Sequence, residues 1–359
     1  MKRRKFLMAA MGGAGTAIAA PAIAQSEPTI RWRMPASFPK SLDTIYGGAE
    51  LIADRVSKLT DGKFQIRPYA AGEIVPALQV LDAVQNNTVE CGYTAGFYYI
   101  GKSPALVFDT GVPFGLTPRQ HNAWIYRGGG LELTRKVYAS FNVISFPAAN
   151  TGAQMGGWFR KEIKAVDDLK GLRMRAAGFL GQVLEKLGVV PQQIPASDVY
   201  LALEKGTIDA VEWVGPYDDE KLGLHKVAKF YYAPGVLELG ASVSLLVNND
   251  VWSKLPPAYQ EAIQSACRES NLEVLAHYDS LNTAALRRLI GNGVKLSYWS
   301  TDIMKAMQKA TTEVMNENAR KDPQFKEVYT SWKAFRDDQH LWMSVNDGGA
   351  ERFLYANRG

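Results

Sequence analysis

Apolar and polar positions alternate along the chain in a way that predicts strands and helices in turn. Residues 29–34 and 64–69 alternate with the period of a strand, and residues 42–59 repeat with the period of a helix. A helix is predicted over 76–85 and a further strand over 89–94. Because this β-α-β-α-β order is typical of a mostly parallel sheet with helices on its faces, the pattern predicts an α/β fold.

The same kind of pattern returns in the second half of the chain. Strands are predicted over 171–175 and 208–213, with helices between them, so residues 151–235 form a second set of β-α-β units. A long apolar strand is predicted over 236–247, and it carries Glu238 near its start. Two α/β units joined in this way predict two lobes with a cleft between them.

The C-terminal part of the chain is predicted to be mainly helical. Residues 257–290 contain no glycine and no proline after the first position, so they predict one helix of about 50 Å at 1.5 Å per residue. Helices are also predicted over 302–320 and 323–345, and the last of these carries Trp332, Phe335, Leu341 and Trp342. Such a stripe is ordinary core when it is packed, and it indicates a partner surface when it is exposed.

The amino terminus has the features of an export signal rather than of a folded element. Residues 1–7 are rich in Lys and Arg, a Gly/Ala-rich segment follows, and Ala22-Ile-Ala24 fits a cleavage site. The pair Arg3-Arg4, followed by Phe-Leu, has the twin-arginine form, with an ordinary Sec signal as the alternative. We therefore expect the mature protein to begin near Gln25, in the periplasm.

Composition and charge exclude some classes of function. Hydrophobic residues make up 47% of the 359 residues and charged residues 21%, and no internal segment is apolar for long enough to span a bilayer. The chain has 41 basic and 36 acidic residues, and removal of residues 1–24, which hold four basic and no acidic residues, leaves 37 and 36. A nearly neutral mature protein gives no electrostatic reason to expect nucleic-acid binding.

The chain has two cysteines, Cys91 in a predicted strand and Cys267 in a predicted helix. An oxidising compartment would permit a disulfide between them. We expect two buried free thiols instead, because an isolated Cys behaves as a small apolar residue in a protein core.

The first candidate for chemistry is a pair of arginines on the predicted strand 171–175. Arg173 and Arg175 share one face of the strand, and only Arg175 stands at its carboxyl end. In open α/β sheets, ligands bind at the carboxyl ends of strands, and a guanidinium presents a planar fork of donors that matches a carboxylate. Arg175 is therefore a candidate to bind a carboxylate, and two exposed surface charges are the alternative.

Four segments of the chain resemble the solute-binding proteins of tripartite ATP-independent periplasmic (TRAP) transporters. They are DDLKGLRMR at 167–175, ALEKGTIDAVE at 202–212, LQVLDAVQ at 78–85 with TVECG at 88–92, and VWSKLP at 251–256. Together they span nearly the whole chain after the signal peptide, and their combination is specific. Two positions depart from the family pattern, since the usual Asp-Gly of the second segment is Asp209-Ala210 and Cys91 stands before Gly92.

The resemblance implies a two-lobed, periplasmic-binding-protein-like α/β fold in which a long helix packs across both domains and the cleft closes around one organic anion. In this interpretation, residues 25–150 with about 236–300 form domain I, and residues 151–235 form domain II. Residues 301–359 are C-terminal helices and a candidate dimerisation element, and residues 1–24 are the signal peptide. The resemblance also implies that Arg175 holds the substrate carboxylate.

Within the family, the chain most resembles the subgroup that binds 2-oxo acids such as pyruvate together with a metal ion. The resemblance implies that the metal ligands are Gln154, Glu212, Trp213 and Glu238, with Gln154 and Trp213 also at the substrate. The weaker candidates for the pocket wall are Asn150, Tyr93, Phe97 and Tyr98.

Electrostatics supports a cation at this position. Glu212 and Glu238 would each bring a negative charge toward an anionic substrate, and Arg175 alone cannot balance all three. A hard cation held by carboxylate, amide and carbonyl oxygens would supply the missing charge. Sodium is the expectation from the subgroup, and calcium is the alternative because two carboxylates also suit a divalent ion. The alternative to a bound cation is that either Glu212 or Glu238 lies outside the site, where it faces solvent or pairs with a Lys.

The sequence therefore predicts a periplasmic binding protein, not an enzyme, that delivers a 2-oxo monocarboxylate to the membrane permease subunits of a TRAP transporter and forms a homodimer. A 2-hydroxy acid such as lactate, bound with calcium, is an alternative ligand. An exported metal-dependent enzyme acting on small organic acids is a further alternative, although the chain has no Gly-x-Ser-x-Gly, His-Glu-x-x-His or glycine-rich phosphate loop. A ligand-sensing partner of a receptor would have the same sequence features.

Overall fold

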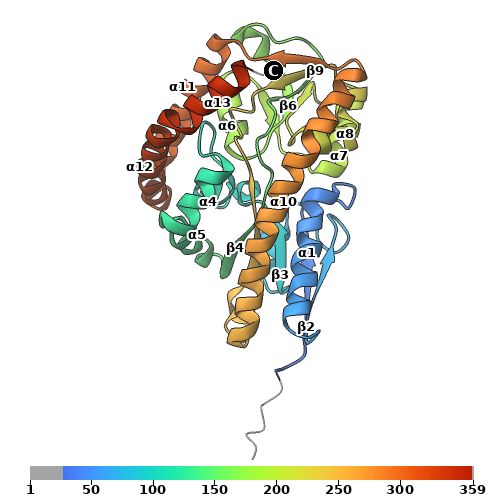
Figure 1. Cartoon of the computed structure of the whole chain (residues 1–359), viewed down its shortest axis with the longest axis vertical. Helices are drawn as coiled ribbons and strands as arrows, with labels where there is room; N and C mark the ends of the chain where they lie inside the picture. The colour runs from blue at the N-terminus through green and yellow to red at the C-terminus, as the bar shows by residue number, and fades with distance from the viewer. Residues whose placement is uncertain (1–26, 358–359) are drawn as a thin grey trace, which may run out of the picture.

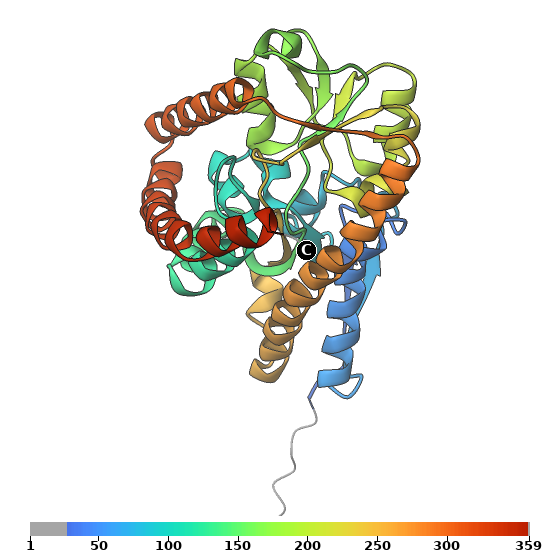
Figure 2. The same cartoon turned by 45° about the horizontal axis from the view of Figure 1, so that its top comes forward.

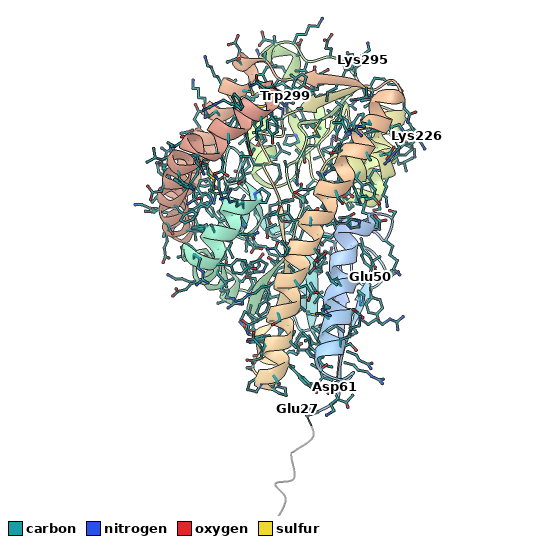
Figure 3. All side chains as sticks on the ribbon, in the orientation of Figure 1. Glu27, Glu50, Asp61, Lys226, Lys295 and Trp299 are labelled. Atoms are coloured by element: carbon teal, nitrogen blue, oxygen red, sulfur yellow. The ribbon has the colours of Figure 1, made fainter. Side chains whose placement is uncertain are left out.

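Two lobes lie one above the other along the long axis of the computed structural model, which describes residues 27–357 (Figure 1). The predicted signal peptide at 1–24 lies outside the described residues. Within those residues, no helix is both long enough and apolar enough to cross a membrane. Charged side chains of both signs face solvent at the periphery, as Figure 3 shows for Glu50, Asp61, Lys226 and Lys295.

The first lobe is built on two small sheets and the helices that cover them. Its elements are β1 (Ile30–Pro35), α1 (Asp43–Leu59), β2 (Phe64–Tyr69), α2 (Val80–Gln85), β3 (Cys91–Thr94), η1 (Gly96–Tyr99), η2 (Pro104–Leu106), α3 (Val107–Thr110), α4 (Pro118–Arg127), α5 (Gly130–Ala139), β4 (Val143–Asn150), β10 (Ser242–Asn248) and α9 (Asn249–Trp252). β1 and β2 are parallel, whereas β10 is the central strand of the other sheet and is antiparallel to both β3 and β4. A bridge between Ala36 and Tyr93 connects the two sheets.

The second lobe is built on one six-stranded sheet. Its elements are β5 (Gly157–Phe159), η3 (Val166–Leu169), β6 (Arg173–Arg175), α6 (Gly178–Lys186), β7 (Val190–Gln192), α7 (Ala196–Glu204), β8 (Ala210–Val211), α8 (Pro216–Lys221), η4 (Leu224–Lys226), β9 (Phe230–Ala233) and β11 (Lys295–Tyr298). The strand order is β11-β9-β5-β8-β6-β7, with β5 antiparallel to both neighbours and the other pairs parallel. β11 joins this sheet, whereas the division made from sequence placed 236–300 in the first domain.

One long helix, α10 (Pro257–Gly291), runs along both lobes, as the sequence predicted (Figure 1). Its 35 residues include buried side chains from Tyr259 near one end to Leu289 near the other. Gly48 lets α1 lie close to β3 and α10, because a Cβ at this position would lie 2.4 Å from the Tyr93 hydroxyl oxygen. At the same place, the Ser270 hydroxyl of α10 donates to the Gly48 carbonyl at 3.2 Å. The helix thus packs against both lobes, on α1 and β4 of the first and on α8 of the second.

The last three helices form a second connection between the lobes. They are α11 (Thr301–Lys321), α12 (Pro323–Val345) and α13 (Asp347–Ala356), and Figure 2 shows them curving round one side of the molecule. α11 packs on α6, and α12 packs on α3, α4 and α5. The ring of Phe108 lies 5.0 Å from that of Phe325 and 5.7 Å from that of Trp332, both buried. Trp342 is 54% exposed, so the aromatic stripe of α12 is core in its first half and surface in its second.

The structure corrects the sequence prediction in several places. The strand predicted over 236–247 begins only at Ser242, and Glu238 lies in a loop, where its N–H donates to the Gly235 carbonyl at 2.9 Å. Glycines on both sides of Glu238 interrupt the strand pattern there. The sheets are not mostly parallel as predicted. The three-stranded sheet is antiparallel, because β4 leads the chain out of the first lobe and β10 leads it back, and the six-stranded sheet is mixed, because β5 is antiparallel to both of its neighbours.

The sequence pattern does not predict the short helices α3, α4, α8 and α9 or the terminal helix α13. For α4 a signal was present, because Thr117, Pro118 and Gln120 form a capping box with Pro in the first turn. Both cysteines are buried and free, as predicted.

Candidate functional site

A buried pocket lies where the two lobes meet. Residues from both lobes and from the crossing segments line it: Phe38, Ile45, Ala95, Phe97, Tyr98, Thr151, Gln154, Arg175, Glu212, Trp213, Val214, Glu238, Ala241 and Val243. The first lobe supplies mainly aromatic and aliphatic side chains. Of the polar side chains, Arg175 and Glu212 come from the second lobe, and Thr151, Gln154 and Glu238 come from the segments that cross between the lobes. An apolar wall facing a small polar cluster is the usual composition of a small-molecule site.

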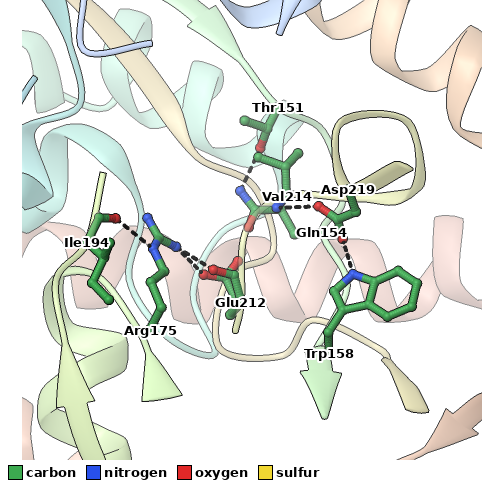
Figure 4. Close-up of polar contacts among 8 residues, drawn as sticks. All are labelled: Thr151, Gln154, Trp158, Arg175, Ile194, Glu212, Val214 and Asp219. Atoms are coloured by element: carbon green, nitrogen blue, oxygen red, sulfur yellow. Dashed lines mark hydrogen bonds and ion pairs between the residues drawn. The ribbon is translucent and has the colours of Figure 1, made fainter. Parts of the chain in front are cut away.

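Arg175 stands at the carboxyl end of β6, just before α6, and its side chain is 2% exposed. Its Nε donates to the Ile194 carbonyl at 3.3 Å, and its Nη1 donates to the Glu212 carbonyl and, at 3.2 Å, to the Glu212 carboxylate (Figure 4). The guanidinium also lies 4.5 Å from the centre of the Trp213 ring. Within the described residues its Nη2 has no partner, so the guanidinium is held in place with donor capacity left for a ligand.

Three side-chain and backbone oxygens converge beside this arginine. When the Gln154 amide nitrogen donates to Thr151 Oγ1 at 2.9 Å, as drawn in Figure 4, the amide oxygen faces Glu212 Oε1 and the Trp213 carbonyl. The opposite amide orientation places the nitrogen 2.8 Å from Glu212 Oε1 and 3.2 Å from the Trp213 oxygen. Oxygens this close need either those amide protons or a cation between them, and amide, carboxylate and carbonyl oxygens suit Na⁺ or Ca²⁺. The residues present therefore fit a hard cation.

The charges of the pocket also fit a cation. Burial raises the pKa of Glu212 well above its usual value, while Arg175 acts against that rise and Glu238 adds to it. Burial likewise raises the pKa of Glu238 to about 8, again opposed by Arg175. Two buried carboxylates thus share one guanidinium. Residues 27–357 hold no cluster of three or more His, Cys, Asp or Glu side chains placed to bind a metal, and this candidate site relies on neutral oxygens as well.

Asp219 on α8 positions the backbone that follows Trp213. Its Oδ2 accepts from Trp158 Nε1 at 2.9 Å and its Oδ1 accepts from the Val214 N–H at 3.3 Å (Figure 4). Its Oδ2 also accepts from the Tyr231 hydroxyl at 2.7 Å. Burial raises the pKa of Asp219 to about 6, and the hydrogen bonds from Tyr231 and Trp158 oppose that rise. This network sets the direction of the Trp213 carbonyl.

The two lobes are in contact across the pocket. Gln193 Nε2 of the second lobe donates to the Tyr98 carbonyl at 3.0 Å. Asp43 of α1 accepts from the Tyr217 hydroxyl at 3.3 Å and pairs with Lys221 at 2.5 Å. A ligand in the pocket would therefore be enclosed, and its release would require these contacts to break.

The structure brings most of the predicted site residues together. Arg175, Gln154, Glu212, Trp213, Glu238, Phe97 and Tyr98 all line the pocket. Tyr93 does not, because it lies in the core behind Phe38, with the rings edge to face at 5.9 Å. Asn150 does not either, and its Oδ1 instead accepts from the Gly152 N–H at 3.0 Å.

Sequence reasoning did not single out Thr151, Phe38 or Val243. Thr151 Oγ1 contacts the Gln154 amide and accepts from the Ala241 N–H at 2.9 Å, so it ties the crossing segments to the site. Its sequence neighbours carry no motif that would have identified it. Phe38 and Val243 come from segments far apart in the chain, and a pattern of apolar residues does not distinguish a pocket wall from core.

Taken together, a two-lobed α/β fold with a buried arginine and convergent oxygens between the lobes has the features of a protein that encloses a small ligand between two domains. Residues 36–322 match the family described as "Bacterial extracellular solute-binding protein, family 7", and the chain belongs to this family. It is a solute-binding protein of the TRAP transporter type, as the sequence resemblance predicted.

Similar proteins with known names or structures cover nearly the whole chain. The "Monocarboxylate 2-oxoacid-binding periplasmic protein" of Nostoc sp. PCC 7120 is 54% identical over all of both chains. A TRAP solute-binding protein from Bordetella bronchiseptica, a mixed-occupancy dimer with copurified calcium and picolinate, is 53% identical with a TM-score of 0.91, over 92% of this chain and 98% of that chain. A TRAP protein from Pseudoalteromonas atlantica with bound sodium and pyruvate is 35% identical with a TM-score of 0.88, over 90% and 99%.

Proposed function

We propose that this protein binds a short monocarboxylate 2-oxo acid, with pyruvate as the simplest case, together with a cation, and delivers it from the periplasm to a TRAP permease. The observation that carries the proposal is the meeting of Arg175 with the oxygens of Gln154, Glu212 and Trp213 in one buried pocket. A 2-oxo acid has a carboxylate for the guanidinium and a neighbouring carbonyl oxygen for the cation. The names of the Nostoc and Pseudoalteromonas relatives support this ligand class.

The protonation of Glu238 relates to the choice of cation. With Arg175 positive and Glu212, Glu238 and the ligand negative, the site carries two uncompensated negative charges, which a divalent ion would balance. Burial raises the pKa of both carboxylates, but Glu212 has Arg175 Nη1 at 3.2 Å to stabilise its charge and Glu238 has no such ion pair within the described residues. If Glu238 is therefore the one that keeps its proton, one negative charge remains and sodium balances it. Sodium is our first expectation, and calcium, which would displace the proton, is the alternative.

The apolar wall limits the length of the ligand. Phe97 and Tyr98 lie edge to face at 4.8 Å, and Phe38 lies 6.5 Å from Tyr98. These rings face the polar cluster across the pocket. We therefore propose that Phe97, Tyr98 and Phe38 select a short aliphatic chain.

Calorimetric titration of pyruvate into the metal-stripped mature protein tests the proposal. We expect tight binding with sodium and weak binding without a cation, and binding only with calcium would change the ion but keep the site. Two buffers of different ionisation enthalpy would detect the proton released if calcium displaces it from Glu238. Parallel titrations with lactate test the 2-hydroxy acid alternative, and recovery of unchanged pyruvate argues against an enzyme. Equal binding with and without cations would contradict the cation site.

A substitution at Gln154 tests the cation site directly, and one at Gln193 is its matched control. Gln154→Met removes the amide oxygen but keeps the side-chain length. The loss of one interaction with a charged group costs about 1.5–3 kcal/mol. We therefore expect the factor by which sodium raises the affinity for pyruvate to fall by about tenfold or more. Gln193→Met, which removes the Gln193–Tyr98 contact away from the oxygens, should keep the sodium dependence. An unchanged dependence in Gln154→Met would show that Gln154 does not bind the cation.

We also propose that the two domains divide near residues 150 and 236, where the chain crosses between the lobes.

We propose that the protein forms a homodimer through its C-terminal helices. The end of α12 and helix α13 expose large apolar side chains: Leu341, Trp342, Val345, Phe353 and Leu354. An apolar surface of this kind marks an interaction site, and the Bordetella relative is a dimer. Light scattering should give twice the monomer mass, and a monomer mass at micromolar concentration would contradict the dimer.

A further inference from the structure

A second small pocket lies in the first lobe, away from the ligand pocket. It is formed where α4, α5, β4 and α10 meet, and Tyr126, Leu131, Arg135, Phe146, Pro147, Gln264, Cys267 and Arg268 line it. None of these residues lines the ligand pocket. Figure 1 shows β4 between α5 and the lower part of α10, and β4 packs against both helices. The walls of the pocket are therefore formed by regular secondary structure.

Arg135 is held in this pocket in a fixed position. Its Nε donates to the Ser145 carbonyl at 3.0 Å, and its guanidinium lies 4.7 Å from the centre of the Phe146 ring. The Arg268 guanidinium lies 5.6 Å from the centre of the Tyr126 ring. Both guanidiniums are thus oriented by an aromatic ring, and the Nη atoms of each have no partner within residues 27–357.

The positive charge of this pocket has no counterpart in the described chain. Neither Arg135 nor Arg268 forms an ion pair within residues 27–357, and burial together with the charge of Arg268 lowers the pKa of the half-buried Arg135. Burial raises the pKa of Cys267 and raises that of Tyr126 to about 12, so both stay neutral. A partly buried cation without a counter-charge is costly, because the Ser145 carbonyl and the Phe146 ring replace only part of the water removed from Arg135.

We propose that this pocket binds a small oxyanion, of the carboxylate, sulfate or phosphate type, between Arg135 and Arg268. Two guanidiniums present paired N–H donors that match the oxygens of such an anion, and the anion would supply the missing negative charge. The remaining lining is apolar except for the Gln264 amide, the Tyr126 hydroxyl and the Cys267 thiol, and it carries no carboxylate to repel an anion. The site is separate from the ligand pocket and does not depend on the ligand proposed there.

Thermal unfolding with sulfate, phosphate or acetate, at constant ionic strength set with chloride, tests the site. Sulfate and phosphate also stabilise proteins generally by exclusion from their surfaces, and that effect does not saturate. The measured quantity is therefore the saturable part of the rise in Tm. The variants are Arg135→Met, Arg268→Met and the control Arg127→Met, which removes an exposed arginine of α4 that does not line the pocket.

We expect a saturable rise in the wild type and in Arg127→Met, and at least a tenfold weaker apparent affinity in Arg135→Met and Arg268→Met. Arg268 is exposed, so its variant should fold even if Arg135→Met does not. An anion that bound at Arg175 instead would give the same saturable rise in all four proteins. That result, or no saturable rise in the wild type with any of the three anions, would overturn the proposal.

Discussion

Replacing Arg175 with Met should weaken pyruvate binding by about 100-fold or more. The Arg175 guanidinium is buried and already fixed by the Ile194 carbonyl and by Glu212, so it can bind a carboxylate with little loss of side-chain freedom. Truncating one partner of a buried, hydrogen-bonded charge pair costs about 2–5 kcal/mol, and about 2.8 kcal/mol corresponds to 100-fold. Calorimetry in saturating sodium measures the change directly. Arg175→Lys keeps the positive charge but loses the paired N–H donors of the guanidinium. Its affinity for pyruvate should therefore lie between those of Arg175→Met and the wild type.

The matched control is Arg173→Met, two residues earlier on the same strand. Arg173 points to the surface, where it pairs with Asp209 at 2.7 Å with a side chain that is 44% exposed. Exposed pairs contribute little to stability, so this variant should bind pyruvate like the wild type. Because Arg175→Met leaves Glu212 without its partner, its thermal unfolding should be measured as well. A folded Arg175→Met protein with unchanged affinity would show that this arginine does not hold the ligand.

Replacing Trp332 with Ala should lower the free energy of unfolding by about 3–5 kcal/mol, the usual cost of truncating a large buried aromatic side chain. Trp332 is 1% exposed, packs on Phe108 and Tyr329, and lies against Gly115, where an added Cβ would be 2.9 Å from its ring. The substitution would leave a cavity between α12 and the first lobe. Denaturant unfolding followed by tryptophan fluorescence and by circular dichroism measures the loss.

Trp342→Ala is the matched control on the same helix. Trp342 is 54% exposed, so its removal should change the stability of the monomer by less than about 0.5 kcal/mol. If the proposed dimer uses this surface, Trp342→Ala should weaken dimerisation while Trp332→Ala mainly destabilises the fold. Equal losses of stability in the two variants would contradict the packing of α12 described above.

Much of this structure was predictable because local patterns determine local elements. The helix α10 followed from a long segment without glycine or internal proline, and α1 and α12 begin and end within a residue of their predicted limits. Arg175 was a candidate because it stands at the carboxyl end of a predicted strand, and the order of strand and helix along the chain is enough to recognise such a position. The sequence resemblance pointed to Gln154, Glu212, Trp213 and Glu238, which no local pattern marks and which all line the pocket.

Other features were not predictable, because they depend on contacts between distant segments. Glu238 was placed on a strand, and the structure puts it in a loop that crosses between the lobes. Tyr93 and Phe97 lie four residues apart and look alike in sequence, yet Phe97 lines the pocket and Tyr93 is core behind Phe38. The side of a strand or turn that an aromatic residue faces is decided by what packs against it.

The sequence by itself therefore determined the alternation of strands and helices, the long helix and the arginine at the strand end, and its resemblance to a known family determined the class of protein. The first three features follow from periodicity and chain breakers, which act over short distances along the chain. Only the tertiary structure decided which oxygens converge beside Arg175, which aromatic rings form the wall, and where Arg135 and Arg268 lie without a counter-charge. Those arrangements bring together residues from separate segments of the chain: the meeting of the two lobes forms the ligand pocket, and the packing of α10 on the first lobe places Arg268 beside the pocket that holds Arg135.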